Sequence, residues 1–210
     1  MAKLILARHG ETVWNVEKIY RGRTDVNLDE VGIKQAELLG KYLSNWELEA
    51  IYSSPLKRAL DTANIIARYQ KVGVHVAEGL IDFDYGEWQS LSEQEVKRLY
   101  PTLHNEWLNN PRKAKMPGGE SLDDVRRRAI EVVDDVLSKY QGNVVLVSHR
   151  VVNKVLICSL LGLDNSHFWN IKQDVGGITI FNYVDGRFVL TRHNDTSHLK
   201  ELQKTVLDDF

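Results

Sequence analysis

The stretch Leu4-Ile5-Leu6-Ala7-Arg8-His9-Gly10-Glu11-Thr12 decides the fold prediction for this chain. Its first four residues form an apolar run of the kind found in a strand buried in a parallel sheet. The run ends abruptly in an arginine, a histidine and a glycine. Because open α/β sheets bind ligands just beyond the carboxyl ends of their strands, we expect His9, with Arg8 beside it, to face an anion.

A second stretch, Val144-Val145-Leu146-Val147-Ser148-His149-Arg150, repeats this layout much later in the chain. A single histidine at a strand end is most often held by backbone hydrogen bonds. Two such strands, each followed by a histidine next to an arginine, instead favour one shared site at the sheet edge.

Length and composition limit the class of protein. The chain has 210 residues, 43% of them hydrophobic, which suits one core better than two. We therefore expect a single domain over residues 1–210. The formal net charge of -2 gives no reason to expect a nucleic-acid partner. No apolar stretch approaches the length needed to span a membrane, and the first apolar stretch does not have the pattern of a signal peptide.

Cys158 is the only cysteine in the chain. It excludes an intramolecular disulfide and the zinc frameworks that need several cysteines, and it fits a reduced, cytoplasmic setting.

Apolar strands and helical patterns alternate along the chain, which predicts a parallel sheet with crossover helices. The expected strands are 3–7, 49–52, 74–77 and 143–147; the expected helices are 29–43, one opening at Ser54-Pro55, 92–100, 122–140 and 151–161. Segments 178–183 and 188–192 flank Asp185-Gly186 and predict an antiparallel edge hairpin. The fold class is therefore α/β: a three-layer sandwich with helices on both faces of a mostly parallel sheet.

We expect residues 79–119 to form a cap-like insertion over the strand ends. In helix 29–43, the inward residues are expected to be Val31, Ala36, Leu39 and Leu43.

Arg58 lies in the first turn expected of the helix that opens at Ser54. A cation is unfavourable there because the helix dipole and the free N–H groups attract anions. The position makes better sense if an anion lies between Arg58 and the helix end. Arg8, Arg58 and His149 would then converge on one group with several oxygens, and phosphate fits guanidinium groups best.

The loop Asp82-Phe83-Asp84-Tyr85-Gly86-Glu87-Trp88 alternates acidic and aromatic residues. Acidic loop residues are usually solvated, which is our interpretation of Glu87. A carboxyl group near apolar side chains or other negative charge has a raised pKa, as a general acid requires.

Four stretches, in this order, resemble the histidine phosphatase superfamily, which includes the cofactor-dependent phosphoglycerate mutases. They are residues 8–12 with Trp14-Asn15, residues 53–63, Gly118-Gly119-Glu120-Ser121, and Ser148-His149. Each motif alone is weak, whereas the ordered set is specific and spans nearly the whole chain. Residues 192–199 resemble the tail of small bacterial members, including metal-independent phosphoserine phosphatases.

The resemblance implies a role for each matching residue. His9 is the nucleophile that forms a phosphohistidine, Arg8, Arg58 and His149 hold the phosphoryl oxygens, and Asp82 occupies the place of the proton donor. Asn15, Arg21 and Gly22 match positions that line the substrate pocket, and Tyr85 and Arg150 complete the candidate substrate contacts. Two departures stand out: the family donor is most often glutamate, and Ser90 replaces a common glycine.

The sequence thus predicts a metal-independent phosphomonoesterase that needs no cofactor and acts on a small phosphorylated metabolite, with phosphoserine or a sugar phosphate as candidates. His9 must be neutral and His149 would help most as a cation, so we expect their pKa values to diverge. A phosphoglycerate mutase is the alternative, although mutases of the family usually carry a longer insertion. The sequence shows no spacing of metal ligands that would indicate a metallophosphatase. A phosphate-binding protein without catalytic activity is a further alternative. The sequence leaves open whether the protein forms a homodimer.

Overall fold

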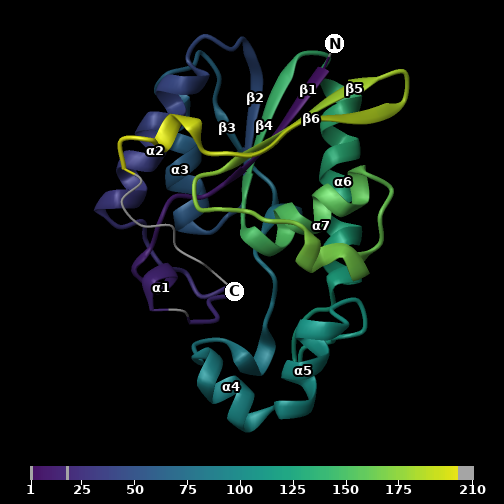
Figure 1. Ribbon diagram of the computed structural model, residues 1–210. Helices are drawn as coiled ribbons and strands as arrows, with labels where there is room; N and C mark the ends of the chain where they lie inside the picture. The colour runs from purple at the N-terminus through teal and green to yellow at the C-terminus, as the bar shows by residue number, and fades with distance from the viewer. Residues whose placement is uncertain (1, 18, 203–210) are drawn as a thin grey trace.

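A six-stranded mixed sheet in the order β3-β2-β4-β1-β5-β6 organises the computed structural model, which describes residues 2–17 and 19–202 (Figure 1). Strands β1, β4, β2 and β3 run parallel, and β5 and β6 continue the sheet as antiparallel neighbours. The strands are β1 (Ala2–Arg8), β2 (Leu48–Ser53), β3 (Val74–Val76), β4 (Asn143–Ser148), β5 (Ile178–Val184) and β6 (Arg187–Asp195). The expected fold class is confirmed.

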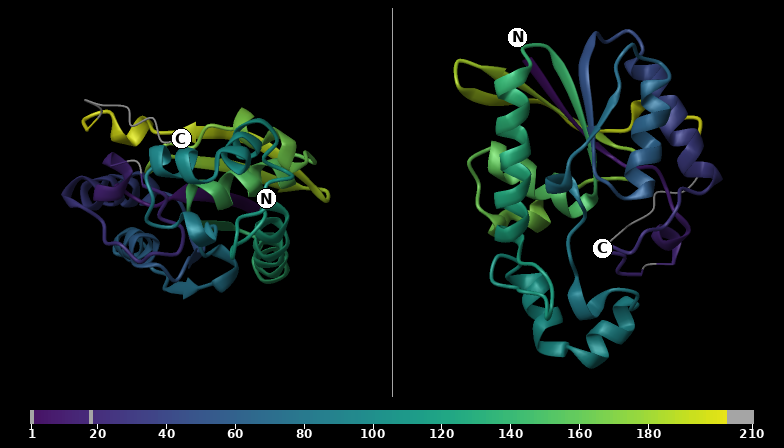
Figure 2. Two further views of the ribbon diagram at one scale, coloured as in Figure 1. Left: turned by 90° about the horizontal axis from the view of Figure 1, so that it is seen from below. Right: turned by 180° about the vertical axis from the view of Figure 1, so that it is seen from behind.

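Helices cover both faces of the sheet (Figures 1 and 2). The helices are α1 (Val13–Val16), α2 (Glu30–Leu43), α3 (Lys57–Ala67), α4 (Glu93–Leu99), α5 (Pro101–Asn109), α6 (Leu122–Lys139) and α7 (Arg150–Leu160). Short 3-10 helices are η1 (Glu78–Leu80), η2 (Gly86–Trp88), η3 (Asn165–Asn170) and η4 (Ser197–Leu199). None of the described helices is both long and apolar enough to cross a bilayer.

Each face of strand β1 belongs to a different apolar core. Leu4 and Leu6 pack with residues of α6 and α7, whereas Ile5 and Ala7 pack with residues of α2 and α3. Successive side chains of a strand point to opposite faces, so a strand covered on both sides must be apolar throughout. This is the physical reason for the uninterrupted apolar run before His9.

The carboxyl ends of β1, β2 and β4 meet at one edge of the sheet. Arg8 pairs in register with Ser148, and the His9 amide donates to the Ser148 carbonyl at 3.0 Å. The Ser54 amide likewise donates to the Val147 carbonyl at 3.0 Å. Pairing of the strands therefore brings three loops that are distant in sequence to one place.

The segment from residue 79 to residue 119 carries η2, α4 and α5 and extends beyond this edge of the sheet (Figure 1). Ser92 caps α4 in a capping box with Glu95, as its spacing predicts. The Trp169 indole donates to the Trp107 carbonyl at 2.7 Å, which ties α5 to η3.

The edge hairpin is also confirmed. Asp185 and Gly186 connect β5 to β6 with φ values of 50° and 75°. Two consecutive left-handed residues match the right-handed twist of the flanking strands, which is why Asp-Gly predicts this turn.

Two sequence expectations are wrong in detail. Helix α3 begins at Lys57 with Leu56 as its N-cap, not at Ser54-Pro55. The Ser54 hydroxyl accepts from the Leu56 amide at 3.3 Å, ahead of the helix, and lies 2.7 Å from His149 Nε2. Val31 is 40% exposed, so it does not belong to the inward face of α2. Gly32 takes the inward position there, since a Cβ on this residue would lie 2.1 Å from the Glu11 carbonyl oxygen.

Candidate active site

His9 is buried at the carboxyl end of β1, with 1% of its surface exposed. Its Nδ1 lies 2.7 Å from the Gly10 carbonyl oxygen, which can only accept a hydrogen bond, so the imidazole proton is on Nδ1. Burial, reinforced by the positive charge of Arg58, lowers the pKa of His9 well below its usual value. The ring is therefore neutral, and its Nε2 carries a lone pair.

His149 follows β4 and is the N-cap residue of α7. Its ring centroid lies 5.2 Å from that of His9. The Ser54 hydroxyl lies 2.7 Å from Nε2, and the Asp82 Oδ2 atom lies 3.4 Å from Nδ1. His149 is thus held between a serine after β2 and the acidic loop.

Arg58 occupies the first turn of α3 with its side chain fully buried. It donates hydrogen bonds to the carbonyls of Gly22 (2.8 Å) and Thr24 (2.9 Å) and to Asp82 Oδ2 (2.8 Å). Arg8 is 1% exposed and donates to the Gln173 carbonyl at 2.7 Å. Both guanidinium groups are therefore fixed in position by the backbone of neighbouring loops.

Arg58 Nε and His149 Nδ1 are buried at this site and have no hydrogen-bond partner within the described residues. Buried donors in folded proteins are nearly always satisfied, and an unsatisfied one calls for an explanation. Both belong to side chains that contact Asp82 Oδ2. An anion with several oxygens bound beside His9 would satisfy them.

Of the three carboxylates in the acidic loop, Asp82 alone reaches this cluster through the contacts just described. Asp84 Oδ1 accepts the Gly86 amide at 2.9 Å, and its Oδ2 lies 3.5 Å from Arg23. Glu87 accepts the Tyr100 hydroxyl on the exposed surface. In this loop the Asp82 carboxylate therefore faces the cluster around His9, whereas the carboxylates of Asp84 and Glu87 make their contacts elsewhere.

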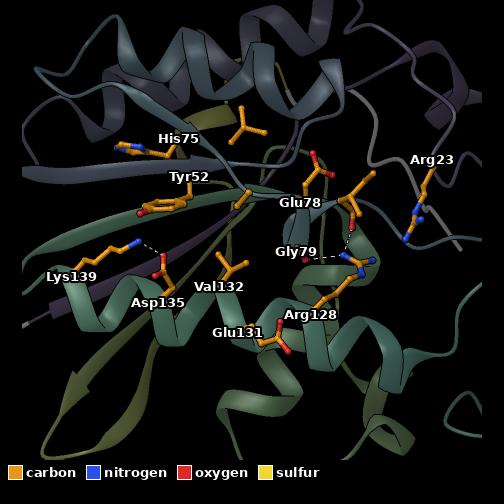
Figure 3. Close-up of a pocket in the computed structure, with 13 residues that line it drawn as sticks. Arg23, Tyr52, His75, Glu78, Gly79, Arg128, Glu131, Val132, Asp135 and Lys139 are labelled. Carbon is orange, nitrogen blue, oxygen red and sulfur yellow. Dashed lines mark hydrogen bonds and ion pairs between the residues drawn. The ribbon is translucent and has the colours of Figure 1, made fainter.

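Arg128 of α6 clamps the backbone that carries Asp82. Its guanidinium donates to the carbonyls of Gly79 (2.8 Å), Ile81 (2.6 Å) and Asp82 (3.1 Å). Figure 3 shows this side chain reaching from α6 toward Gly79 at the end of a cavity of about 710 Å³. Through its hydrogen bonds to three backbone carbonyls, Arg128 holds the loop against α6.

Glu120, from the Gly118-Gly119-Glu120-Ser121 motif, anchors the clamp. Its carboxylate accepts two hydrogen bonds from Arg128 at 2.9 and 3.0 Å and lies 3.0 Å from Arg23. It also accepts the Asp84 amide at 3.0 Å. The motif thus contributes to the conformation of the acidic loop rather than to the cluster around His9.

Comparison with known proteins agrees with this geometry. Residues 4–196 match the histidine phosphatase superfamily (branch 1). The chain belongs to this family.

Three similar proteins illustrate the relationship. Phosphoserine phosphatase 1 of Hydrogenobacter thermophilus is 39% identical over 202 residues, which cover 96% of each chain. The structure of Bacillus stearothermophilus YhfR has a TM-score of 0.90 at 32% identity, covering 95% of this chain and 100% of that one. A phosphoserine phosphatase from Entamoeba histolytica, solved with 3-phosphoglyceric acid, has a TM-score of 0.85 at 32% identity with the same coverage. The protein is a phosphoric monoester hydrolase of the histidine phosphatase superfamily.

The other residues implied by the family resemblance differ in how directly they contact the cluster around His9. The Gly22 carbonyl accepts from Arg58, and Arg21 is close enough to influence the pKa of both His9 and His149. The Asn15 Oδ1 atom accepts from the Thr12 amide and hydroxyl, so this oxygen caps α1.

Tyr85 and Arg150 lie next to each other at the same site. The Tyr85 ring is buried against Tyr20 and Phe83, and burial raises the pKa of its hydroxyl to about 12 although Arg150 acts in the opposite direction. The neutral phenol can therefore donate a hydrogen bond across the physiological pH range.

The expectation that the pKa values of His9 and His149 diverge is wrong for this structure. Burial, followed by the charge of Arg58, lowers the pKa of His149 well below its usual value, as it does for His9. The guanidinium groups of Arg58, Arg8 and Arg21 act on both rings and disfavour a further positive charge there. Both imidazoles of this histidine phosphatase are neutral.

Ser90 replaces the common glycine but keeps a glycine-like backbone. Its φ is 68°, in the left-handed region that glycine favours, and its amide donates to the Tyr20 carbonyl at 2.8 Å. The loop therefore needs a left-handed residue at position 90, which explains why glycine suits this position.

Sequence reasoning missed the contributions of Ser54 and Arg128. Ser54 has cap chemistry, and nothing local shows that its partner is His149, 95 positions away. Arg128 stands in the run Arg126-Arg127-Arg128, and no local signal distinguishes it from its neighbours. Within the part of the chain that the structure describes, no three His, Cys, Asp or Glu side chains are arranged to hold a metal ion.

Proposed function

We propose that this protein is a metal-independent phosphomonoesterase that hydrolyses a small phosphorylated metabolite through a phosphohistidine at His9. The observation that carries the proposal is the environment of His9: a neutral imidazole with its Nε2 lone pair available, beside Arg8, Arg58 and His149. Such a group is a nucleophile at neutral pH without prior loss of a proton.

In the first step, Nε2 of His9 attacks the phosphorus atom, and the bond from phosphorus to the ester oxygen breaks. The carboxyl group of Asp82 gives its proton to the departing oxygen, so the alcohol leaves neutral. Arg8, Arg58 and His149 stabilise the charge on the three transferred oxygens.

In the second step, water attacks the phosphohistidine and the bond from phosphorus to nitrogen breaks. The carboxylate of Asp82 accepts a proton from that water, which restores the acid for the next turnover. Inorganic phosphate and neutral His9 are the products, and the guanidinium groups supply the positive charge that metal ions supply in other phosphatases.

We further propose that residues 79–119 serve as a cap that limits access to His9 within a single domain. The relatives named as phosphoserine phosphatases favour phosphoserine as a candidate substrate, with sugar phosphates as the other candidate class. Asn15, Arg21, Gly22, Tyr85 and Arg150 are proposed substrate contacts. A cytoplasmic location and a homodimer stay predictions from the sequence.

The proposal predicts hydrolysis of phosphomonoesters in the presence of excess EDTA. Release of inorganic phosphate from p-nitrophenyl phosphate, phosphoserine and a set of sugar phosphates measures it. We expect turnover of several substrates and no loss of rate on chelation. Loss of rate that Mg²⁺ or Zn²⁺ restores contradicts metal independence, isomerisation of phosphoglycerate without phosphate release favours the mutase, and inertness on every substrate favours a non-catalytic phosphate-binding protein.

Replacement of Asp82 tests the proposed acid. We expect Asp82→Asn to reduce hydrolysis of alkyl phosphates by at least about 100-fold, because general acid catalysis contributes roughly 10²–10⁴-fold. p-Nitrophenyl phosphate should lose much less, since nitrophenolate leaves with little protonation. Rates of both substrate types, measured for Asp82→Asn and for the control Asp84→Asn, decide the assignment. If Asp84→Asn shows the leaving-group dependence and Asp82→Asn does not, the acid is misassigned.

A further inference from the structure

The Ser54 hydroxyl lies against the ring of His149, and both residues are fully buried. Ser54 directly follows β2, and its amide donates to the Val147 carbonyl of β4 at 3.0 Å, two residues before His149. Pairing of β2 with β4 therefore fixes both partners, and the Ser54 oxygen lies 2.7 Å from His149 Nε2. This distance is that of a good hydrogen bond, whose direction the surrounding groups determine.

The direction follows from the single proton of the Ser54 hydroxyl, which also has two lone pairs. Its oxygen accepts from the Leu56 amide at 3.3 Å, which uses one lone pair. Among residues 2–17 and 19–202, His149 Nε2 is the only acceptor within hydrogen-bond distance of this hydroxyl. If Nε2 carried a proton, the buried hydroxyl would have no acceptor, a situation that folded proteins avoid. The Ser54 hydroxyl therefore donates to Nε2.

The other ring nitrogen of His149 gives the same answer independently. Nδ1 lies 3.4 Å from Asp82 Oδ2, an oxygen that accepts from Arg58 at 2.8 Å. A lone pair on Nδ1 would face the lone pairs of this oxygen, whereas an N–H group is attracted to it. Because burial keeps His149 neutral, its ring carries one N–H group, and both neighbours assign that proton to Nδ1.

The position of this proton decides whether His149 can assist phosphoryl transfer. Phosphoryl oxygens accept hydrogen bonds, and a neutral imidazole donates from one nitrogen only. Nδ1 is on the side of the ring that faces Asp82, the proposed proton donor to the leaving oxygen. With the proton on Nδ1, His149 donates toward the transferred group. With the proton on Nε2, a lone pair would repel the same oxygens.

His9 uses the same tautomer in the opposite way. The Gly10 carbonyl accepts from its Nδ1, which leaves the Nε2 lone pair for the attack on phosphorus. A hydrogen bond at one ring nitrogen sets what the other nitrogen offers. A carbonyl beside His9 and a hydroxyl donor beside His149 thus give the site one lone pair and one N–H group, although both rings are neutral.

We propose that Ser54 is a positioning residue for phosphoryl transfer, because its hydroxyl donates to Nε2 of His149 and so holds the tautomer whose Nδ1–H group binds a phosphoryl oxygen. The inference rests on the proposed function and deepens it. It explains how a neutral His149 stabilises the transferred group without gaining a proton.

NMR spectroscopy of protein with isotope-labelled ring nitrogens in histidine measures the tautomer directly, and His149→Gln identifies the signals of His149. At neutral pH we expect a protonated Nδ1 and an unprotonated Nε2. Ser54→Ala should shift this population toward the Nε2–H tautomer. The matched control is Ser53→Ala, since Ser53 is equally buried and its hydroxyl donates to a backbone carbonyl at 2.9 Å. The control should keep the Nδ1–H tautomer.

An Nε2–H tautomer or a doubly protonated His149 ring in the unmodified protein overturns the inference. An unchanged tautomer in Ser54→Ala also overturns it. The spectrum of the unmodified protein decides the tautomer even if Ser54→Ala does not fold, or if the protein hydrolyses no phosphomonoester and the proposed function fails.

Steady-state rates on p-nitrophenyl phosphate test the consequence for catalysis. We expect Ser54→Ala to reduce kcat/KM by about 10- to 100-fold, somewhat less than loss of a whole transition-state donor. In a His149→Ala background, Ser54→Ala should have almost no further effect, because the two residues act as one unit. Full activity of Ser54→Ala, or an equal loss in both backgrounds, contradicts a role through His149. Ser53→Ala should keep its activity.

Discussion

Replacing His9 by alanine is expected to remove essentially all phosphatase activity and to leave the fold intact. Loss of a nucleophile in a covalent mechanism costs as much as about six orders of magnitude in kcat, so we expect a loss of at least about 10⁴-fold. The printed contacts of the side chain are a hydrogen bond to Gly10 and a ring contact with His149, and His9 follows β1 rather than belonging to it, so the strand should persist. Steady-state rates on p-nitrophenyl phosphate and phosphoserine measure the loss.

The matched control for His9→Ala is His75→Ala, since His75 is an exposed histidine of β3 that stacks on Tyr52 away from the cluster. It should keep its activity. Circular dichroism and urea unfolding of His9→Ala should give a native spectrum and a midpoint close to that of the unmodified protein. A His9→Ala variant that folds and still turns over at a normal rate contradicts a nucleophilic role.

Arg58→Ala is expected to produce the second largest effect, a decrease in kcat/KM of about two to three orders of magnitude. Removing one donor that stabilises transition-state charge costs roughly 3–4 kcal/mol. Arg58 also donates to Asp82, so its loss disturbs the acid as well as the phosphoryl site. Rates on an alkyl phosphate, measured well below the unfolding temperature, give the size of the effect.

The sequence alone predicts that Arg58→Ala changes stability little or even raises it, because clustered cations repel in the empty protein. The contacts of Arg58 favour a loss instead. Two loop carbonyls and the buried Asp82 carboxylate lose their partner, and breaking a buried ion pair on one side costs about 3–5 kcal/mol. Urea unfolding measures this, with Arg68→Ala at the exposed end of α3 as the control. A large loss of stability with full activity would make Arg58 a structural residue only.

Most of the fold could be predicted because its signals are local. The apolar runs of β1 and β4, the capping box at Ser92 and the Asp185-Gly186 turn each specify structure within a few residues. The start of α3 could not be predicted in this way. Ser54 is a good cap by local chemistry, but its hydroxyl accepts from the Leu56 amide ahead of the helix and also contacts His149, a contact that only the paired strands create.

The candidate site divides in the same way. Arg8, His9 and His149 could be predicted because strand ends place them, and Asp82 was reached through the family resemblance. The clamp by Arg128 could not be predicted, because its hydrogen bonds to the carbonyls of Gly79, Ile81 and Asp82 form only when α6 packs against the acidic loop. The pKa of His149 was misjudged for the same reason, since the number of guanidinium groups around it follows from the fold.

The account depends most on the covalent intermediate at His9, and trapping that intermediate tests it most directly. The protein is mixed with p-nitrophenyl phosphate, quenched in alkali within milliseconds and digested, and the peptide that contains His9 is examined by mass spectrometry. We predict an added phosphoryl group on His9 that survives alkali, is lost in acid and is absent from the His9→Ala variant. Continued turnover with no phosphorylated His9, or with the phosphoryl group on another residue, would contradict the account.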